Sequence, residues 1–406
     1  MAESEPAVYS APIASGLVAS TTQAIRPNAK LIALLSLGHF VVDLNQGSLP
    51  ALLPFLKTAH QLSYAAVATI VLAANVASSI VQPVFGYFAD QTARRWMIPV
   101  SVALTGLGFG LLGVAPGYPV ILALVLLMGF GVAAFHPEGY KTATGVAGDR
   151  KATALSFFSL GGNVGVAVGP PIVTALVATL GLTGNLAMIL PALVVAAFLV
   201  AVLPRLSVSP RAVPTKVAVE GENRYGAMAL LVLVVMLRSW TQLGFSTFVP
   251  FYYVDVLKED PQLVGSLLFV FLGAGALGTV VVGPLADRWG TRPFMVWVFL
   301  AGTPLAVLFL HVSGPLAFIV AGLMGATLVS TFTIAVVLGQ QYLPRNAGMA
   351  SGLIVGFATG TAGVGVTLLG WVADTWGLMS ALWISALMPI PGFAAAYFLP
   401  PARRRS

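Results

Sequence analysis

The chain has no cysteine and very few charged residues. Its 406 residues include no cysteine, which excludes disulfide bonds, thiolate metal sites and cysteine nucleophiles. Only 8% of the residues are charged, whereas a soluble globular domain carries roughly 25%. So few charges cannot cover a water-soluble fold of this size, and we therefore exclude a soluble enzyme. The remainder is apolar, because 58% of the residues are hydrophobic and the mean hydropathy is +0.94.

Long apolar runs dominate the sequence. A helix that crosses a bilayer needs about 20 predominantly apolar residues, and the chain contains twelve such runs. The short alternating strands of a transmembrane barrel are absent from the sequence pattern, so we predict an all-α membrane protein. The 43 glycines and 27 prolines suit membrane helices, where neighbouring helices satisfy the freed backbone groups. The predicted spans are 31–56, 64–89, 97–115, 119–143, 151–180, 184–204, 226–255, 262–286, 293–312, 314–340, 346–374 and 378–400.

One long polar connection divides these spans into two sets of six. The first residues lack the basic start and apolar core of a signal peptide, and we interpret them as a short disordered tail. We expect five segments: a cytoplasmic N-terminal tail (1–28), a six-helix bundle (29–204), a cytoplasmic linker (205–225), a second six-helix bundle (226–400) and a basic cytoplasmic tail (401–406).

The basic residues predict the orientation in the membrane. Nearly every lysine and arginine outside the spans falls on the side that carries the termini and the linker, and the other side keeps only Lys57 and Lys258. Because cytoplasmic loops are enriched in these residues, we place both termini in the cytoplasm of a multi-pass protein of the cell (inner) membrane. The net charge of +7 follows from this distribution, so no nucleic-acid partner is expected.

A short motif ends the second span and recurs at the end of the eighth. In both copies a glycine precedes an aspartate by four residues, and arginines follow. The glycine allows two helices to approach closely, and the aspartate can pair with the arginines or cap a helix N-terminus. Because the motif occurs twice at matching places, we interpret its residues as gates and not as interfacial charges that only set the topology. The predicted gating residues are Gly86, Asp90, Arg94 and Arg95 in the first copy, and Gly283, Asp287, Arg288 and Arg292 in the second.

Five ionisable residues lie at least five residues from either end of a predicted span, where each costs roughly 2.5–3.5 kcal/mol on insertion scales. Asp43 and His39 in the first span share one helix face with Gln46, because the spacing is i, i+4, i+7. Arg238 in the seventh span lies at about the same depth as Asp43. His136 and Glu138 lie in the fourth span.

Structural explanations compete with functional ones for these residues. Either histidine can serve as a hydrogen-bonding group of the helix, and His136 precedes Pro137, which frees carbonyls. Glu138 can simply pair with Lys141 or Arg95. Asp43 is the hardest to explain structurally, because it is acidic, short and in mid-span. Polar residues in membrane helices more often form hydrogen bonds between packed helices than contacts with a ligand. Six further polar residues are nevertheless candidates for lining a substrate route: Gln46, Asn75, Asn163, Trp240, Gln242 and Thr331.

The duplicated glycine-to-aspartate motif and the arrangement of six plus six spans resemble the major facilitator superfamily. Three segments resemble its fosmidomycin-resistance family more narrowly, and a stretch of the fifth span resembles a glycine–proline motif associated with drug–proton exchange in the superfamily. Ala93 and Gln341 depart from the usual pattern. The three segments are Gly38-His39-Phe40 with Asp43 and Gln46, Phe135-His136-Pro137-Glu138, and residues 343–352; the glycine–proline stretch contains Gly165, Gly169 and Pro170.

The resemblance implies two pseudo-symmetric bundles around a central cavity lined by spans one, four, seven and ten. We therefore predict a monomeric transporter that exports small organic molecules, fosmidomycin-like phosphonates or other drugs, in exchange for protons. Asp43, tuned by His39 and assisted by His136 and Glu138, would carry the proton, and Arg238 would pair with Asp43 or with an anionic substrate. The alternative is a proton-coupled uptake symporter for a small organic anion or sugar. We expect no enzyme activity, cofactor or metal, since the chain has no GxSxG, HExxH or P-loop motif.

Overall fold

The structure, a computed structural model, describes residues 28–85, 95–148, 151–205 and 222–401. Within these ranges the chain is helical and contains no β-strand. Eleven of the described helices are long and apolar enough to cross a membrane. The twelfth predicted span is α1 (Ala29–His60), which stands apart from those eleven because polar residues such as His39, Asp43 and Asn45 interrupt its apolar sequence. The predicted all-α membrane fold is confirmed.

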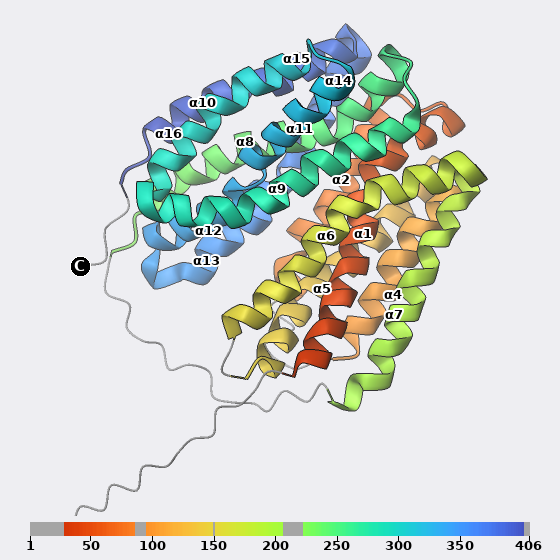
Figure 1. Cartoon of the computed structure of the whole chain (residues 1–406), viewed down its shortest axis with the longest axis horizontal. Coiled ribbons are helices and arrows are strands. Elements are labelled where there is room, and N and C mark those ends of the chain that lie inside the picture. Colours follow the sequence, from red (N-terminus) through yellow and green to blue (C-terminus); the bar gives the residue numbers. More distant parts are fainter. Residues whose placement is uncertain (1–27, 86–94, 149–150, 206–221, 402–406) are drawn as a thin grey trace, which may run out of the picture.

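The helices follow one another in two bundles (Figure 1). After α1, the N-terminal bundle contains α2 (Tyr64–Asn75) with the π-helical η1 (Val76–Ile80), α4 (Met97–Gly110) with η2 (Leu111–Val114), α5 (Tyr118–Val146), α6 (Lys151–Leu180), and η3 (Leu182–Met188) leading into α7 (Ile189–Val202) and η4 (Leu203–Arg205). The C-terminal bundle contains α8 (Tyr225–Phe251) with η5 (Tyr252–Val256), α9 (Pro261–Trp289), α10 (Thr291–Phe309), α11 (Gly314–Leu328), α12 (Thr331–Tyr342), η6 (Pro344–Asn346), α13 (Ala347–Gly352) with η7 (Leu353–Ala358), α14 (Ala362–Trp376), α15 (Leu378–Leu387) and α16 (Pro389–Tyr397).

Helices α1 and α6 pack backbone against backbone. A Cβ atom at Gly165 would overlap the carbonyl oxygen of Phe40, and one at Gly169 would overlap that of Leu44. Small residues permit such close approach in membranes, where helices gain no hydrophobic driving force from association. On the other side of the same stretch, a Cβ at Gly265 of α9 would lie 2.9 Å from the carbonyl oxygen of Pro170. The glycine–proline stretch therefore joins α1 to the opposite bundle.

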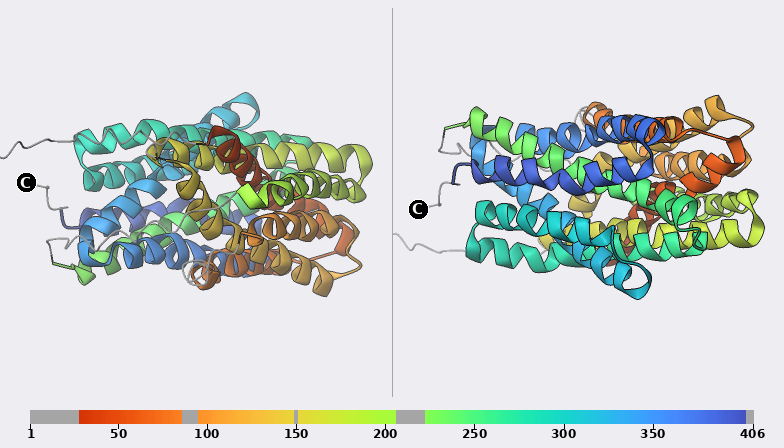
Figure 2. Two further views of the ribbon diagram at one scale, coloured as in Figure 1. Left: turned by 90° about the horizontal axis from the view of Figure 1, so that it is seen from below. Right: turned by 90° about the horizontal axis from the view of Figure 1, so that it is seen from above.

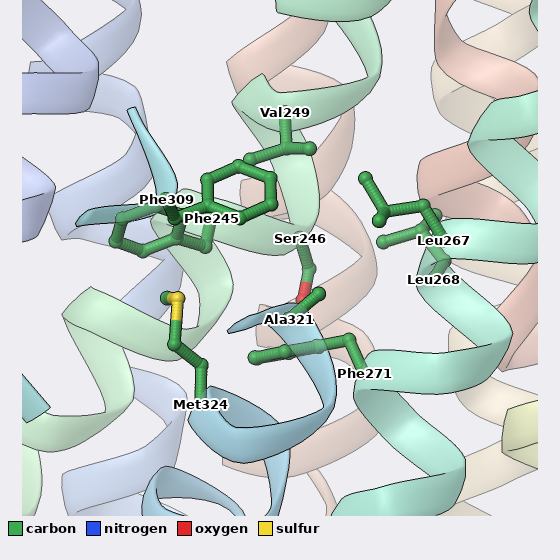
Figure 3. A pocket seen from close by; sticks show the side chains of 9 residues that line it. All are labelled: Phe245, Ser246, Val249, Leu267, Leu268, Phe271, Phe309, Ala321 and Met324. Carbon is green, nitrogen blue, oxygen red and sulfur yellow. The ribbon is translucent and has the colours of Figure 1, made fainter. Parts of the chain in front are cut away.

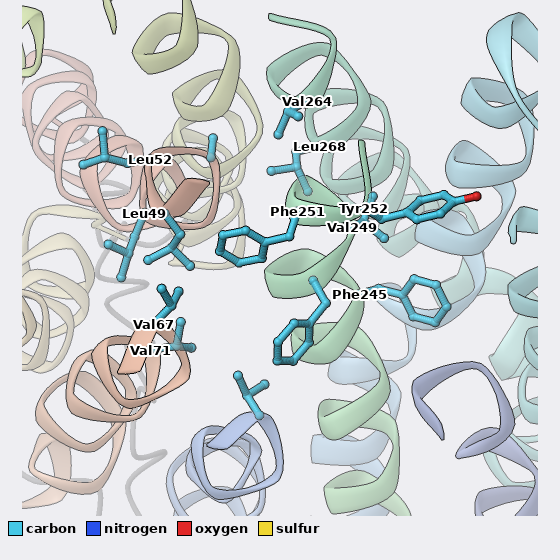
Figure 4. Close-up of a cluster of buried hydrophobic side chains, with 14 of the residues drawn as sticks. Leu49, Leu52, Val67, Val71, Phe245, Val249, Phe251, Tyr252, Val264 and Leu268 are labelled. Atoms are coloured by element: carbon cyan, nitrogen blue, oxygen red, sulfur yellow. The ribbon is translucent and has the colours of Figure 1, made fainter. Parts of the chain in front are cut away.

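The buried apolar side chains show where the two bundles meet. The largest core cluster combines residues of both bundles, including Leu49 and Val71 from the N-terminal one and Phe245 and Phe251 from the C-terminal one (Figure 4). These residues belong to the second half of α1, to α2 and to the second half of α8. We call this end of the molecule, away from the linker, the far end.

The opposite end, where α7 stops and α8 begins, carries the ends of the linker and is called the linker end. Its apolar cores are separate: one cluster contains only residues of the N-terminal bundle and another only residues of the C-terminal bundle. Figures 1 and 2 show the bundles side by side, and in Figure 1 α7 ends near the start of α1. The structure is therefore closed at the far end and divided at the linker end.

Candidate functional site

Three of the four residues predicted to carry protons meet in one buried cluster, the triad of His39, Asp43 and His136. Nε2 of His39 lies 3.2 Å from Oδ2 of Asp43, and Nε2 of His136 lies 3.3 Å from Oδ1. Helix α1 supplies the first two residues one turn apart, and α5 supplies the third. All three side chains are largely shielded from solvent. The carboxylate is therefore held between two imidazoles that come from different helices.

The other ring nitrogens of the triad are fixed by backbone carbonyls. Nδ1 of His39 lies 2.8 Å from the carbonyl oxygen of Phe158 on α6, and Nδ1 of His136 lies 3.0 Å from that of Val132. A carbonyl oxygen only accepts hydrogen bonds, so each Nδ1 must carry a hydrogen. The ring of His39 also stacks on Phe158, with centroids 4.4 Å apart. Both imidazoles are thus oriented with Nε2 toward Asp43.

The triad fits tightly beneath α6. A methyl group at Gly162 would overlap both Nε2 of His39 and Oδ2 of Asp43. Glu138, the fourth residue predicted to carry a proton, is 1% exposed on α5 but does not belong to the triad. The three triad residues also have the donor types of a metal site, with all ligand atoms within 4.8 Å of one another.

Arg238 is buried, and Asp43, one of the two partners predicted for it, is not its partner in this structure. Its Nε donates to the carbonyl oxygen of Leu328 at 2.8 Å, and Nη2 donates to that of Val329 at 3.1 Å. These carbonyls lie where α11 ends, and the break before α12 leaves them available. Asp43 instead has the two imidazoles as its partners. Among the described residues, the guanidinium has no carboxylate partner.

A polar pocket of about 320 Å³ contains Arg238 and lies between the bundles. Asn75 comes from the end of α2, and the other lining residues come from the C-terminal bundle. Oδ1 of Asn75 and Oγ of Ser239 are buried without a hydrogen-bond partner in the described chain. Unsatisfied buried polar atoms are costly, so these groups are suited to a polar ligand. The lining residues are Asn75, Arg238, Ser239, Gln242, Leu243, Ser246, Thr359 and Ala362.

The pocket brings together three of the residues predicted to bind substrate, namely Asn75, Arg238 and Gln242. The other four do not line it. Gln46 is half-buried and Asn163 is exposed, while Trp240 donates from Nε1 to Oγ1 of Thr361 at 3.4 Å. Thr331 donates at 2.8 Å to the same Leu328 carbonyl that Arg238 uses.

Sequence reasoning missed Ser239, Ser246 and Thr359. The two serines share a helix face with Gln242, because the spacing is i, i+3, i+7, and that spacing was a usable signal. Thr359 follows a π-helical turn that the sequence does not mark.

Comparison with known proteins agrees with this architecture. The family model of the Major Facilitator Superfamily matches residues 35–359 and 228–406. The Fosmidomycin resistance protein of Escherichia coli is 31% identical over 403 residues, which cover 96% of this chain and 97% of that protein. The Uncharacterized MFS-type transporter YfnC of Bacillus subtilis is 32% identical over 380 residues, with 91% and 92% covered. The chain belongs to the major facilitator superfamily.

Solved structures of the superfamily have the same fold. The nucleoside transporter NupG superposes with a TM-score of 0.73 at 14% identity, covering 91% of this chain and 98% of that one. The xylose transporter XylE from E. coli, in an inward open conformation, superposes with a TM-score of 0.70 at 15% identity, covering 92% and 97%. The predicted superfamily and the predicted resemblance to the fosmidomycin-resistance protein are confirmed, and the homologues are transporters.

At the far end, polar contacts between the bundles lie beside the shared apolar core of this superfamily member. Nζ of Lys57 lies 3.1 Å from Oδ2 of Asp255, and the Tyr64 hydroxyl donates to the same oxygen at 2.7 Å. Asp374 at the end of α14 accepts hydrogen bonds from the backbone N–H groups of Tyr64 and Ala65, both at 2.8 Å. Its carboxylate thus caps the N-terminus of α2 in the other bundle. We call Lys57, Tyr64, Asp255 and Asp374 the far-end latch.

Most side chains of the predicted gate residues fall outside the described part of the structure. This applies to Gly86, Asp90 and Arg94, while Arg95 is half-buried. In the second copy, Gly283 and Asp287 lie within α9, but their side chains are outside the described residues. Arg288 is exposed, and Arg292 donates from Nη2 to the carbonyl oxygen of Tyr397 at 2.7 Å. The gate remains a prediction.

Proposed function

We propose that this protein exports a small organic anion in exchange for protons, by opening its central pocket alternately to the two sides of the membrane. The observation that carries the proposal is the polar pocket between the bundles, in which the buried Arg238 has no carboxylate partner among the described residues. A buried cation without a counter-charge favours an anionic ligand. Phosphonates are the class suggested by the relative named for fosmidomycin resistance.

The geometry of the triad supports proton binding. With both Nδ1 atoms protonated, a neutral imidazole presents a lone pair on Nε2 to the carboxylate, and two acceptors then face each other. Each of the two contacts with Asp43 becomes a hydrogen bond only when a proton lies between the atoms. When both imidazoles are neutral and Asp43 is ionised, neither contact has a proton. Two further protons are then needed to make both contacts hydrogen bonds. Losing the proton between His136 and Asp43 leaves that contact without a hydrogen and weakens the link between α1 and α5.

Helix α1 offers a physical route from proton binding to the far-end latch. It carries Asp43 of the triad and, fourteen residues later, Lys57 of the latch, which are about 21 Å apart along a continuous helix. A change in packing at the triad therefore moves an element that also holds the two bundles together. Direct competition between a proton and Arg238 at Asp43 is not part of this proposal, because the two residues have different partners.

The direction and orientation rest on sequence evidence. The bias of basic residues toward the linker side supports cytoplasmic termini, and the linker end is then the cytoplasmic end. The division of the two cores at that end corresponds to an inward-facing state, which an exporter needs in order to load its substrate. Export rather than uptake is supported by the fosmidomycin-resistance relative.

Transport in proteoliposomes tests the proposal. Vesicles are loaded with fosmidomycin, a pH gradient of either sign is imposed, and efflux is compared between wild type, Asp43→Asn and His136→Gln. We expect proton-driven exchange in wild type and its loss in both variants, while exchange of substrate for substrate persists. His311→Gln is the matched control, because Nδ1 of His311 bonds the carbonyl four residues earlier just as His136 does, but His311 is outside the triad. Undiminished proton-driven exchange in Asp43→Asn would remove the triad from the mechanism.

A further inference from the structure

A second, small pocket lies inside the C-terminal bundle and is apolar except for one hydroxyl (Figure 3). Its side chains come from α8, α9, α10 and α11, and they converge on one space. Aromatic rings and the flexible side chain of Met324 form much of the wall, and methionine adapts readily to ligands of different shape. The lining residues are Phe245, Ser246, Val249, Leu267, Leu268, Phe271, Phe309, Ala321 and Met324.

The apolar pocket adjoins the polar pocket of the proposed substrate site. Ser246 lines both, and it is the single lining residue that the two pockets share. Arg238 and Ser246 are eight residues apart on α8, which corresponds to about 12 Å along the helix. A ligand with its anionic group beside Arg238 can therefore extend past Ser246 into an apolar space.

We propose that the two pockets are the head and tail subsites of one ligand, an organic anion that carries an apolar arm. This inference rests on the proposed function, because it takes the Arg238 pocket as the site of the anionic head. The described lining of the tail subsite offers no charge and only the Ser246 hydroxyl, so it favours an alkyl or aryl group over a sugar or a second charged group. The arm distinguishes this substrate class from small, fully polar anions.

A homologous series of n-alkylphosphonates, from methyl to octyl, tests the tail subsite. Dissociation constants are measured by calorimetry on the full chain in lipid nanodiscs, with empty nanodiscs subtracted. Burial of one methylene corresponds to about a fourfold gain in affinity, so in wild type we expect affinity to rise about fourfold per carbon until the pocket is full. Ala321→Phe fills the tail subsite, because Ala321 is a buried lining residue of α11. It should abolish the rise of affinity with chain length, and methylphosphonate binding reports whether the variant is folded.

Two controls separate this inference from the proposed function. Leu323→Phe adds the same ring to the exposed face of α11, where the residue is 51% exposed, and should keep the wild-type rise with chain length. Arg238→Gln should weaken every member of the series equally. Methylphosphonate binding with no dependence on chain length would overturn the tail subsite alone. Affinities in Arg238→Gln that equal the wild-type affinities across the series would overturn the anion site. A rise of affinity with chain length in Ala321→Phe equal to that in wild type would overturn the tail subsite and assign the gain to lipid partitioning.

Discussion

The far-end latch can be broken without touching either pocket. Asp374 caps the N-terminus of α2 through two backbone hydrogen bonds, and Asp255 accepts from the Tyr64 hydroxyl and pairs with Lys57. Loss of an N-cap costs about 1 kcal/mol. Loss of Asp255 removes a hydrogen bond to a charged group and a partly exposed ion pair, together about 2 kcal/mol. These contacts join the two bundles, so they stabilise only the state that is closed at the far end.

From these energies we expect the far-end-open population to rise about fivefold in Asp374→Ala and about 30-fold in Asp255→Ala, with about 150-fold in the double variant. Both aspartates accept a hydrogen bond from Tyr64, so the two losses are coupled, and the 150-fold figure is the value for strict additivity. A complete reversal of a 1:99 equilibrium needs about 5.5 kcal/mol, so the shared apolar core must supply the remaining stabilisation of the closed state.

The absence of native cysteine permits a clean assay. Val71→Cys places a thiol in the shared core between the bundles (Figure 4), where the native residue is 4% exposed. Its rate of modification by a water-soluble maleimide, measured in nanodiscs, should follow the far-end-open population. Leu112→Cys is the matched control, because Leu112 is buried in the same cluster and belongs to η2, which packs against α4, α5 and η3 of its own bundle. Labelling of Val71→Cys that does not change in the double variant would refute the latch, and equal gains at Leu112→Cys would indicate unfolding.

Two further substitutions probe the candidate site. Gly162→Ala should abolish proton-driven exchange, because the added methyl group overlaps the triad, whereas Gly352→Ala, with open space around it, should transport normally in the same vesicle assay. Arg238→Lys should lower phosphonate affinity at least tenfold in calorimetry. One ammonium group cannot bond to the Leu328 and Val329 carbonyls, as the guanidinium does, and also face the pocket. Wild-type affinity in this variant would contradict the anion site.

The local part of the site could be predicted from the sequence. His39 and Asp43 are one helical turn apart, so their pairing needs only that the span be helical. The spans themselves follow from the length of apolar runs, because a bilayer imposes one length on every crossing helix. The polar character of α1 and the repeated motif likewise required no tertiary information.

Contacts between distant segments were decided by the tertiary structure. His136 contacts Asp43 only because α5 packs beside α1. The carbonyl that accepts from Arg238 Nε is available only because α11 ends at Leu328. The latch between Asp374 and the start of α2 joins residues 310 positions apart. Helical periodicity determines which side chains share a face of one helix, and it contains no information about which helices become neighbours. The sequence by itself therefore determined the spans, their polar residues and the internal repeat, whereas packing between helices chose the partners of Asp43 and Arg238 and formed the pocket between the bundles.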